Sequence, residues 1–225
     1  DLVRTYIGSL REREAISSST YTDQRHMGRP EGARKVVREV ETQTPVAIAL
    51  AGSFGVPMSE VRARRVLNLT AQILTTRLIA RVREAEQQVY SISAQSVPGV
   101  EYPEMGMFFA ASATAPGNGT RLTGVIHEMF TELAQKGPSA EEVETARAQV
   151  LNSLDEQIKR PEFWSGQLSN LNYRGLELDN VVNAEAQYRT FNEGDVVEVF
   201  SRYYREDSRI TVIVQPKATD DAGEG

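Results

Sequence analysis

Cysteine is absent from this sequence of 225 residues, and histidine is scarce. Without cysteine, the chain has no disulfide, no thiol nucleophile and no cysteine-ligated zinc or iron–sulfur site. The histidines are His26 and His127. A helical HExxH zinc motif starting at His127 would need its second histidine where Thr131 stands, and the inverted HxxEH order is also missing. We therefore expect no metal site within this chain, and we expect His127 to be a surface or boundary residue rather than a ligand.

Long apolar runs and clusters of basic residues are also absent. No stretch approaches the roughly 20 apolar residues that span a bilayer, and the first residues, Asp1 to Arg4, lack the basic-then-apolar pattern of a signal peptide. The chain starts with Asp rather than Met, so we interpret it as a fragment or a processed product. Lys and Arg number 25 against 31 Asp and Glu, which gives a net charge of −6. This acidic balance argues against nucleic acid as a partner.

Sequence motifs of other enzyme classes are missing too. The chain has no G-x-S-x-G nucleophile elbow, no phosphate-binding P-loop and no G-x-G-x-x-G after a predicted strand. Hydrophobic residues make up 40% and charged residues 25% of the chain, which is the balance of a folded globular protein. In such a protein we expect Trp164 and the aromatic residues of the helices to lie in the core.

Hydrophobic periodicity predicts both strands and helices. Runs with the alternation or the β-branched content of strands occur at residues 36–40, 45–51, 89–97, 105–115 and 210–214. Apolar residues at helical spacing predict helices at residues 1–10, 59–82, 122–136, 139–158, 161–171, 181–188 and 196–204. Ser139 and Glu142 have the spacing of a capping box. The order of these elements predicts an α+β fold, with helices layered on one face of a mainly antiparallel sheet.

Two polar stretches lie outside these elements. Residues 11–32 hold few apolar side chains and are punctuated by Gly and Pro, so we interpret them as a linker. The last residues, from Ala218 onwards, are dominated by glycine and acidic residues. We expect them to form a frayed tail.

The transition from the long predicted helix to the strand that follows it carries the most informative motif. The helix ends in a charged run, in which Arg83 and Glu84 shortly precede the first aromatic residue of the strand, Tyr90. This spacing resembles the C-terminal half of the insulinase and pitrilysin-like (M16) zinc metallopeptidases, in which a leucine-rich helix ends R-E-x-x-x-x-x-Y and enters a strand. This sequence has Gln87-Gln88 where the family usually carries a small residue, so we expect a locally different turn.

The resemblance extends from about Arg34 to Gln215. It includes the second strand of the pair, the helix that ends before a Gly-Pro break, and a capped S-x-E-E-V-E-x-A-R helix that begins at Ser139. The stretch DLVRTYIGSL looks like the closing helix of a preceding domain of the family. The resemblance therefore implies the end of a preceding domain with a linker (1–33), an α+β domain of the M16 C-terminal, LuxS/MPP-like type (34–216) and a disordered tail (217–225).

The resemblance implies a clam-shell of two homologous halves that enclose a chamber. Peptide substrates are hydrolysed in this chamber with the help of a bound zinc ion. The zinc ligands, from an HxxEH helix and a distant Glu, belong to the N-terminal half. We therefore expect this chain to be one part of a zinc metalloendopeptidase. On its own, it is expected to bind no zinc and to be inactive. The implied partners are a peptide or unfolded polypeptide substrate and an N-terminal M16 half, in the same protein or in a partner subunit. The resemblance also favours a periplasmic or cell-envelope location.

In active members of the family, the Arg and Tyr of this motif reach across the chamber to the substrate. Carried over, Arg83 and Tyr90 are the catalytic and substrate-binding residues: the guanidinium can hold a peptide carbonyl, and the phenol can donate to an oxygen that becomes negative. A structural role stays open, in which Arg83 pairs with Glu84 or Glu86 and Tyr90 packs in the sheet. Two other functions also stay open: a non-catalytic M16 homologue acting as a structural or partner subunit, and an unrelated α+β binding domain.

Overall fold

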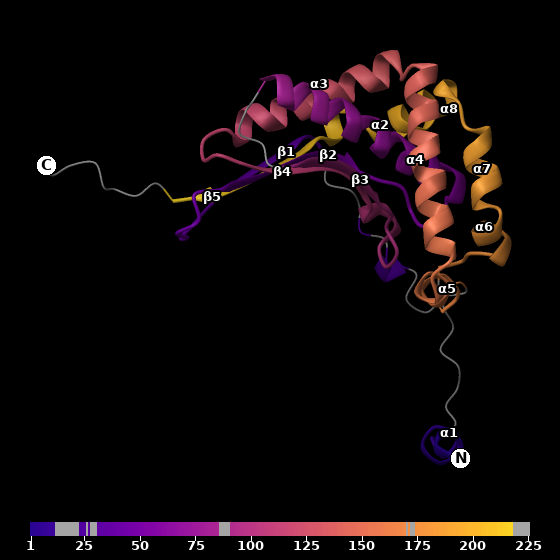
Figure 1. The fold of residues 1–225 in the computed structure, drawn as a ribbon. Helices are drawn as coiled ribbons and strands as arrows, with labels where there is room; N and C mark the ends of the chain where they lie inside the picture. The colour runs from indigo at the N-terminus through magenta and orange to yellow at the C-terminus, as the bar shows by residue number, and fades with distance from the viewer. Residues whose placement is uncertain are drawn as a thin grey trace, which may run out of the picture.

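A layer of helices covers one face of a five-stranded sheet (Figure 1). The structure is a computed structural model, and it describes residues 1–11, 23–25, 27, 31–85, 91–169, 171 and 174–217. Within this described part of the chain, no helix covers the opposite face of the sheet. The predicted α+β fold, with helices layered on one face, is therefore confirmed.

The sheet contains β1 (Arg34–Val40), β2 (Ala47–Phe54), β3 (Ile92–Val97), β4 (Met107–Thr114) and β5 (Ile210–Pro216). Its strand order is β1-β5-β2-β4-β3. The pairs β5–β2, β2–β4 and β4–β3 are antiparallel, whereas β1 runs parallel to β5. The sheet is thus mainly antiparallel, as predicted, and β1 and β3 form its edges.

Small residues on the helix-facing side of β2 let the helices approach the sheet closely. Ala47, Ala49 and Ala51 are fully buried on that side. The alternate residues face the other side of the sheet, where Ile48 keeps 56% of its surface exposed. Successive side chains of a strand point to opposite faces, so β2 contributes to the core with one face and to the surface with the other.

The helix layer contains α2 (Val61–Ala85), α3 (Gly119–Lys136), α4 (Ala140–Ile158) and α8 (Glu193–Tyr203). Helix α2 packs against β3, α4 and α8, and α3 lies against β2. The predicted capping box starts α4: Ser139 Oγ accepts a hydrogen bond from the Glu142 N–H, and the Glu142 carboxylate accepts one from the Ser139 N–H. These two bonds satisfy backbone donors that the first turn of a helix would otherwise leave free.

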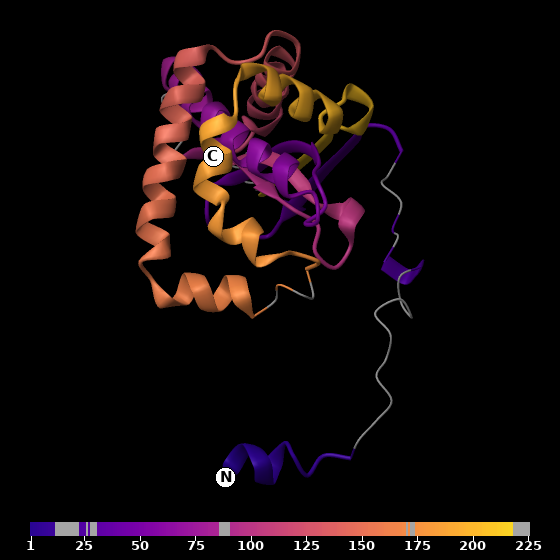
Figure 2. The same ribbon diagram turned by 90° about the vertical axis from the view of Figure 1, so that its right-hand side faces the viewer.

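Shorter helices follow α4 at one end of the domain (Figure 2). They are α5 (Pro161–Leu168), α6 (Leu178–Val182) and α7 (Ala184–Thr190). Pro161 cannot continue the hydrogen-bond ladder of α4 but suits the first turn of α5. The prediction that Trp164 lies in the core is wrong. Trp164 is half-buried on the peripheral helix α5, where its indole N–H donates to the Ile158 carbonyl at 2.8 Å.

The hydrophobic core lies between the sheet and the helix layer. The apolar stripes that predicted α2 and α3 supply much of it, and side chains that are at most 1% exposed include Leu67, Leu74, Leu78, Leu122 and Ile126. The rings of Phe108, Phe130 and Phe200 meet edge to face, with centroids 5.1 to 5.8 Å apart. The core therefore holds α2, α3 and α8 against β4 and its neighbours.

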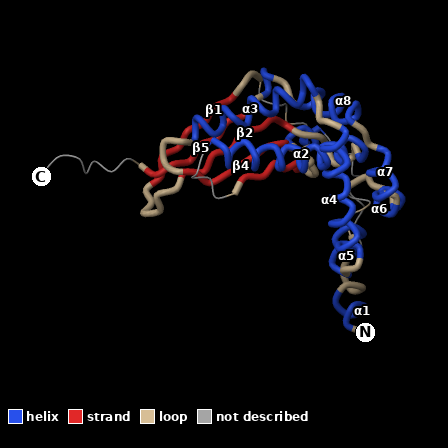
Figure 3. Tube along the Cα trace, turned by 45° about the horizontal axis from the view of Figure 1, so that its top comes forward, coloured by secondary structure: helices blue, strands red, loops and turns tan. Residues whose placement is uncertain are grey.

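The N-terminal helix α1 (Leu2–Tyr6) is shorter than the predicted one and lies apart from the sheet (Figure 3). Its apolar side chains are exposed, with Leu2 and Val3 at 73% and 70%. The predicted linker lies largely outside the described residues, and so does the predicted tail after Lys217. No helix in the described ranges is long and apolar enough to cross a bilayer.

Candidate functional site

A bidentate ion pair holds the C-terminal part of α2 in place. Arg77 Nε and Nη2 donate to the two carboxylate oxygens of Glu142 at 2.5 and 2.7 Å, and Nη2 also reaches the Gly137 carbonyl at 3.2 Å. The Arg77 guanidinium lowers the pKa of Glu142 to about 2. Because Glu142 also caps α4, this pair joins α2 to the start of α4.

The start of β3 is fixed from two sides. Ser112 Oγ of β4 donates to the Ser91 carbonyl at 2.6 Å. Thr75 Oγ1 of α2 accepts from the Ala94 N–H at 2.9 Å, which ties the helix to the strand. In the described sheet β3 pairs with β4 alone. The C-terminal half of α2 and the start of β3 are thus both held in one corner of the domain.

The predicted motif joins the two elements that meet near this corner. Arg83 belongs to the last turn of α2, which ends at Ala85, and the described chain resumes at Ser91, one residue before β3. Tyr90 lies outside the described residues, and so does the side chain of Arg83. Both flanks of the motif are therefore in place, and the meeting of Arg83 with Tyr90 stays a prediction.

The side of the sheet that faces away from the helices forms a second candidate surface, here named the open face. Through the strand register, its apolar residues include Val36, Val40, Ile48, Leu50, Val97, Met107, Phe109, Ile210, Val212 and Val214. Ile48 and Val97 are 56% and 49% exposed. Apolar side chains that are gathered on one uncovered surface favour contact with another protein or with a substrate.

His127 is half-buried where α3 meets β5. Its Nδ1 lies 3.2 Å from the Tyr204 hydroxyl, and its Nε2 lies 3.0 Å from Thr211 Oγ1. Burial, together with the nearby Arg209 cation, lowers the pKa of His127 to about 4. The predicted boundary position is confirmed. Among the described residues, no group of three His, Cys, Asp or Glu side chains is placed to hold a metal ion.

Comparison with protein families decides where this chain belongs. The family model of the peptidase M16 inactive domain matches residues 1–150. The chain belongs to this family. The predicted membership of the M16 family is thereby confirmed, and the hypothesis of an unrelated α+β binding domain is wrong. A comparison with curated proteins gives no match.

Solved structures share the M16 fold at low sequence identity. A protease from Helicobacter pylori gives a TM-score of 0.77 at 14% identity, over 96% of this chain and 51% of its own. The periplasmic protease PqqL from Escherichia coli gives 0.71 at 18% identity, over 96% of this chain and 24% of its own. The inactive peptidase domain of a candidate zinc protease from Bordetella parapertussis gives 0.67 at 17% identity, over 80% of this chain and 98% of its own. The chain thus spans about half or less of the first two proteins.

Sequence reasoning missed the ion pair that holds this corner of the M16 domain. Arg77 and Glu142 lie far apart along the chain, and only the packing of α2 against α4 brings them together. The spacing of Ser139 and Glu142 correctly predicts the capping box, but it does not predict that Glu142 has a second partner. The signal that could have pointed to Arg77 is its place near the apolar stripe of α2, between Leu74 and Leu78.

Proposed function

We propose that this chain is the C-terminal, non-zinc part of an M16 zinc metallopeptidase, which binds the peptide substrate and supplies Arg83 and Tyr90 to the active site. The anchored corner between α2 and β3, at which the R-E-x-x-x-x-x-Y motif falls, carries this proposal. The arginine lies in the last turn of α2, a helix whose C-terminal half is tied to α4 by the pair of Arg77 and Glu142. The tyrosine directly precedes Ser91, whose carbonyl is held by β4. Donors that are held in place before the substrate arrives are the kind that stabilise a developing charge, so the proposal requires Arg83 and Tyr90 to be held in this way.

The two side chains have complementary chemistry for peptide hydrolysis. Arg83 carries a permanent positive charge and several N–H donors, so it can hold a carbonyl of the bound peptide. The Tyr90 hydroxyl can donate a hydrogen bond to the scissile carbonyl oxygen as that oxygen becomes negative. Zinc supplies an activated water when it is bound. No described residues of this chain form a group that fits zinc, so the proposal assigns its ligands to an N-terminal half.

The same proposal assigns partners, a location and domain boundaries. The partners are a peptide or unfolded polypeptide and an N-terminal M16 half, in the same protein or in a partner subunit, and the apolar open face supports a contact of this kind. The location is the periplasm or cell envelope, which the fold of the periplasmic Escherichia coli protease supports. The boundaries are 1–33, 34–216 and 217–225, supported by the start of β1 at Arg34 and the end of β5 at Pro216.

The test compares the chain alone with the chain combined with its N-terminal M16 half. Only the combination is predicted to retain zinc after dialysis and to cleave an unstructured polypeptide such as casein, with cleavage stopped by a chelator. The chain alone is predicted to retain no stoichiometric zinc and to cleave nothing. Zinc held tightly by the chain alone, or chelator-sensitive cleavage by it, would contradict the proposal.

A second candidate is a non-catalytic M16 homologue that acts as a structural or partner subunit. The open face favours it, because an uncovered apolar sheet surface suits contact with another protein. The same experiment separates the two candidates. A stable complex that holds no zinc and cleaves nothing would support the second candidate and contradict the first.

A further inference from the structure

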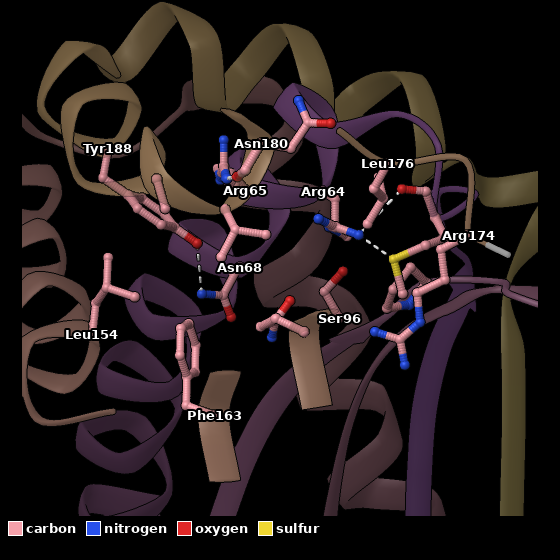
Figure 4. Close-up of a pocket in the computed structure, with 15 residues that line it drawn as sticks. Arg64, Arg65, Asn68, Ser96, Leu154, Phe163, Arg174, Leu176, Asn180 and Tyr188 are labelled. Atoms are coloured by element: carbon pink, nitrogen blue, oxygen red, sulfur yellow. Dashed lines mark hydrogen bonds between the residues drawn. The ribbon is translucent and has the colours of Figure 1, made fainter. Parts of the chain in front are cut away.

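A cavity of about 310 Å³ lies near the N-terminal end of α2, where this helix meets the shorter helices (Figure 4). Helix α2 contributes Arg64 and Arg65 to its wall, and Arg174 comes from the segment before α6. Ser96, near the end of β3, closes another side. The cavity is separate from the peptidase motif, because Arg83 lies at the opposite end of α2.

The arginines meet at this cavity without an acidic partner among the described residues that line it. Arg64 donates to the carbonyl oxygen of Met58 at 3.2 Å and contacts the sulfur of the same residue. Arg65 donates to the Asn180 carbonyl and to the side-chain oxygen of Gln187. All of these acceptors are neutral, so they satisfy hydrogen bonds without balancing the charge.

Positive charge is therefore concentrated in a poorly solvated place. Arg65 is only 6% exposed. Burial lowers the pKa of Arg64, and the neighbouring charges of Arg65 and Arg174 lower it further. A charge that is removed from water is unfavourable unless an opposite charge compensates it, and like charges repel each other. An anion in the cavity would supply the missing opposite charge.

The rest of the wall offers a free hydroxyl and apolar side chains. Ser96 Oγ is buried and has no hydrogen-bond partner among the described residues. Phe163 and Leu176 line the cavity with apolar surface. The Tyr188 hydroxyl accepts a hydrogen bond from the Asn68 side chain at 3.0 Å, so it is already engaged. A charged group with an attached apolar part matches this combination.

We propose that this cavity binds a small organic anion. Arg64, Arg174 and the Ser96 hydroxyl hold its carboxylate or phosphate oxygens. Its apolar part packs against Phe163 and Leu176. Guanidinium groups suit both oxyanions, because their N–H donors form a planar fork that matches two oxygens at once.

Arg65 has a different role in this site. Its contacts to Asn180 and Gln187 tie α2 to α6 and α7. Arg65 therefore stabilises the wall of the cavity and is not assigned to the ligand. The site uses no residue of the proposed peptidase motif. Anion binding can therefore fail or succeed independently of the proposed peptidase function.

Calorimetric titration of the chain with two probe anions tests the proposal. Phenyl phosphate represents a phosphate source, benzoate a carboxylate source, and benzyl alcohol is the neutral control. We expect at least one anion to bind at one site per chain, with an affinity that falls as sodium chloride is added, and we expect benzyl alcohol not to bind. The absence of saturable binding by both anions below roughly 10 mM would overturn the proposal.

Substitutions distinguish a site from general charge attraction. Arg64→Gln and Arg174→Gln should each weaken binding about tenfold or more, because each removes a charge-assisted hydrogen bond. Arg81→Gln removes the same charge from an exposed position near the other end of α2 and should change the affinity less than about twofold. Equal losses in all three variants, or unchanged affinity in both cavity variants, would overturn the proposal.

Thermal melts give a readout that a purely structural arginine would not produce. Arg64→Met keeps an unbranched side chain but removes the charge, so without ligand it should melt at or above the wild-type temperature. The better-binding probe anion should raise the melting temperature of the wild type and no longer raise that of the variant. A variant that melts lower and still gains the full stabilisation from the anion would remove Arg64 from the site.

Discussion

Arg83 has two physical roles open to it, and they predict different kinetics. If the guanidinium holds the peptide in the ground state and the transition state, Arg83→Ala in the complete peptidase should raise KM and lower kcat. The loss in kcat/KM should be about 10- to 100-fold, the scale of one charged hydrogen bond. If Arg83 only interacts with the end of its helix, the change should lower stability slightly and leave the kinetics per folded molecule unchanged.

Steady-state kinetics beside thermal melts measure both effects. Arg81→Ala is the matched control, because it removes the same side chain from an exposed position two residues earlier in α2. Its kcat and KM should equal those of the wild type. Equal kinetic losses in the two variants would mean that the enzyme responds to charge in this region and not to Arg83 itself.

His127 makes the folded protein sensitive to acid. Burial and Arg209 lower its pKa from 6.5 to about 4. Between these values the unfolded chain binds a proton at this residue that the folded chain does not bind. The contribution of neutral His127 to the free energy of unfolding is therefore fully present above pH 6.5. It is lost as the pH falls towards 4, by about 1 to 3 kcal/mol.

Denaturant unfolding at a series of pH values checks this expectation. His127→Gln cannot take up the proton, so its unfolding free energy should depend less on pH in this window than that of the wild type. Its loss of hydrogen bonds to Tyr204 and Thr211 changes the absolute stability, but only the slope with pH reports the titration. Equal slopes in the two proteins would contradict the lowered pKa.

Single functional residues could be predicted only where a motif occupies a short stretch of chain. Arg83 and Tyr90 are close in sequence, so their spacing was enough to indicate a family and a role. Arg65 and Arg174 belong to one cavity only because α2 packs beside the segment before α6. Arginines on an amphipathic helix are typical of a solvated face, so no local pattern predicted this cavity.

At the scale of elements, the link between α2 and α4 should be measurable. Glu142→Gln keeps an acceptor for the capping box but removes the charge that pairs with Arg77. The side chains of this pair are 22% and 32% exposed, so we expect a loss of about 1 kcal/mol in unfolding free energy at neutral pH. Glu132→Gln is the control, because its pair with Lys136 is largely exposed and should matter little.

The same pair has a signature in acid. Arg77 lowers the pKa of Glu142 from 4.5 to about 2, so its contribution is present above pH 4.5 and is lost as the pH falls through that window. Wild-type stability should therefore fall more steeply there than the stability of Glu142→Gln. Parallel pH profiles would show that the pair does not hold α2 to α4.

The elements themselves were largely predictable, because helical and strand periodicity depend on which local face is buried. The exceptions have local causes. The predicted helix at 181–188 is split into α6 and α7, because Asn183 ends one helix and begins the next. The predicted N-terminal helix ends at Tyr6, where Gly8 disfavours another turn.

At the scale of the whole molecule, long-range pairing decides the architecture. The order of elements predicted a mainly antiparallel sheet, but not that β1 would pair in parallel with β5 at one edge. This pairing joins strands from the two ends of the domain, and local patterns hold no information about it. The same limit applies to the open face, because alternation along β2 predicts two faces but not which of them the helices will cover.

The central claim is that this chain completes an active site whose zinc lies in another half of the peptidase. Tyr90→Phe in the complete enzyme tests it most directly, because only a hydroxyl is removed. Tyr102→Phe is the matched control, since Tyr102 is 44% exposed in the loop after β3 and its loss should leave kcat unchanged. If the Tyr90 hydroxyl stabilises the developing charge, kcat should be about 100-fold lower for Tyr90→Phe, with an unchanged melting temperature. Wild-type turnover by a well-folded Tyr90→Phe enzyme would contradict it.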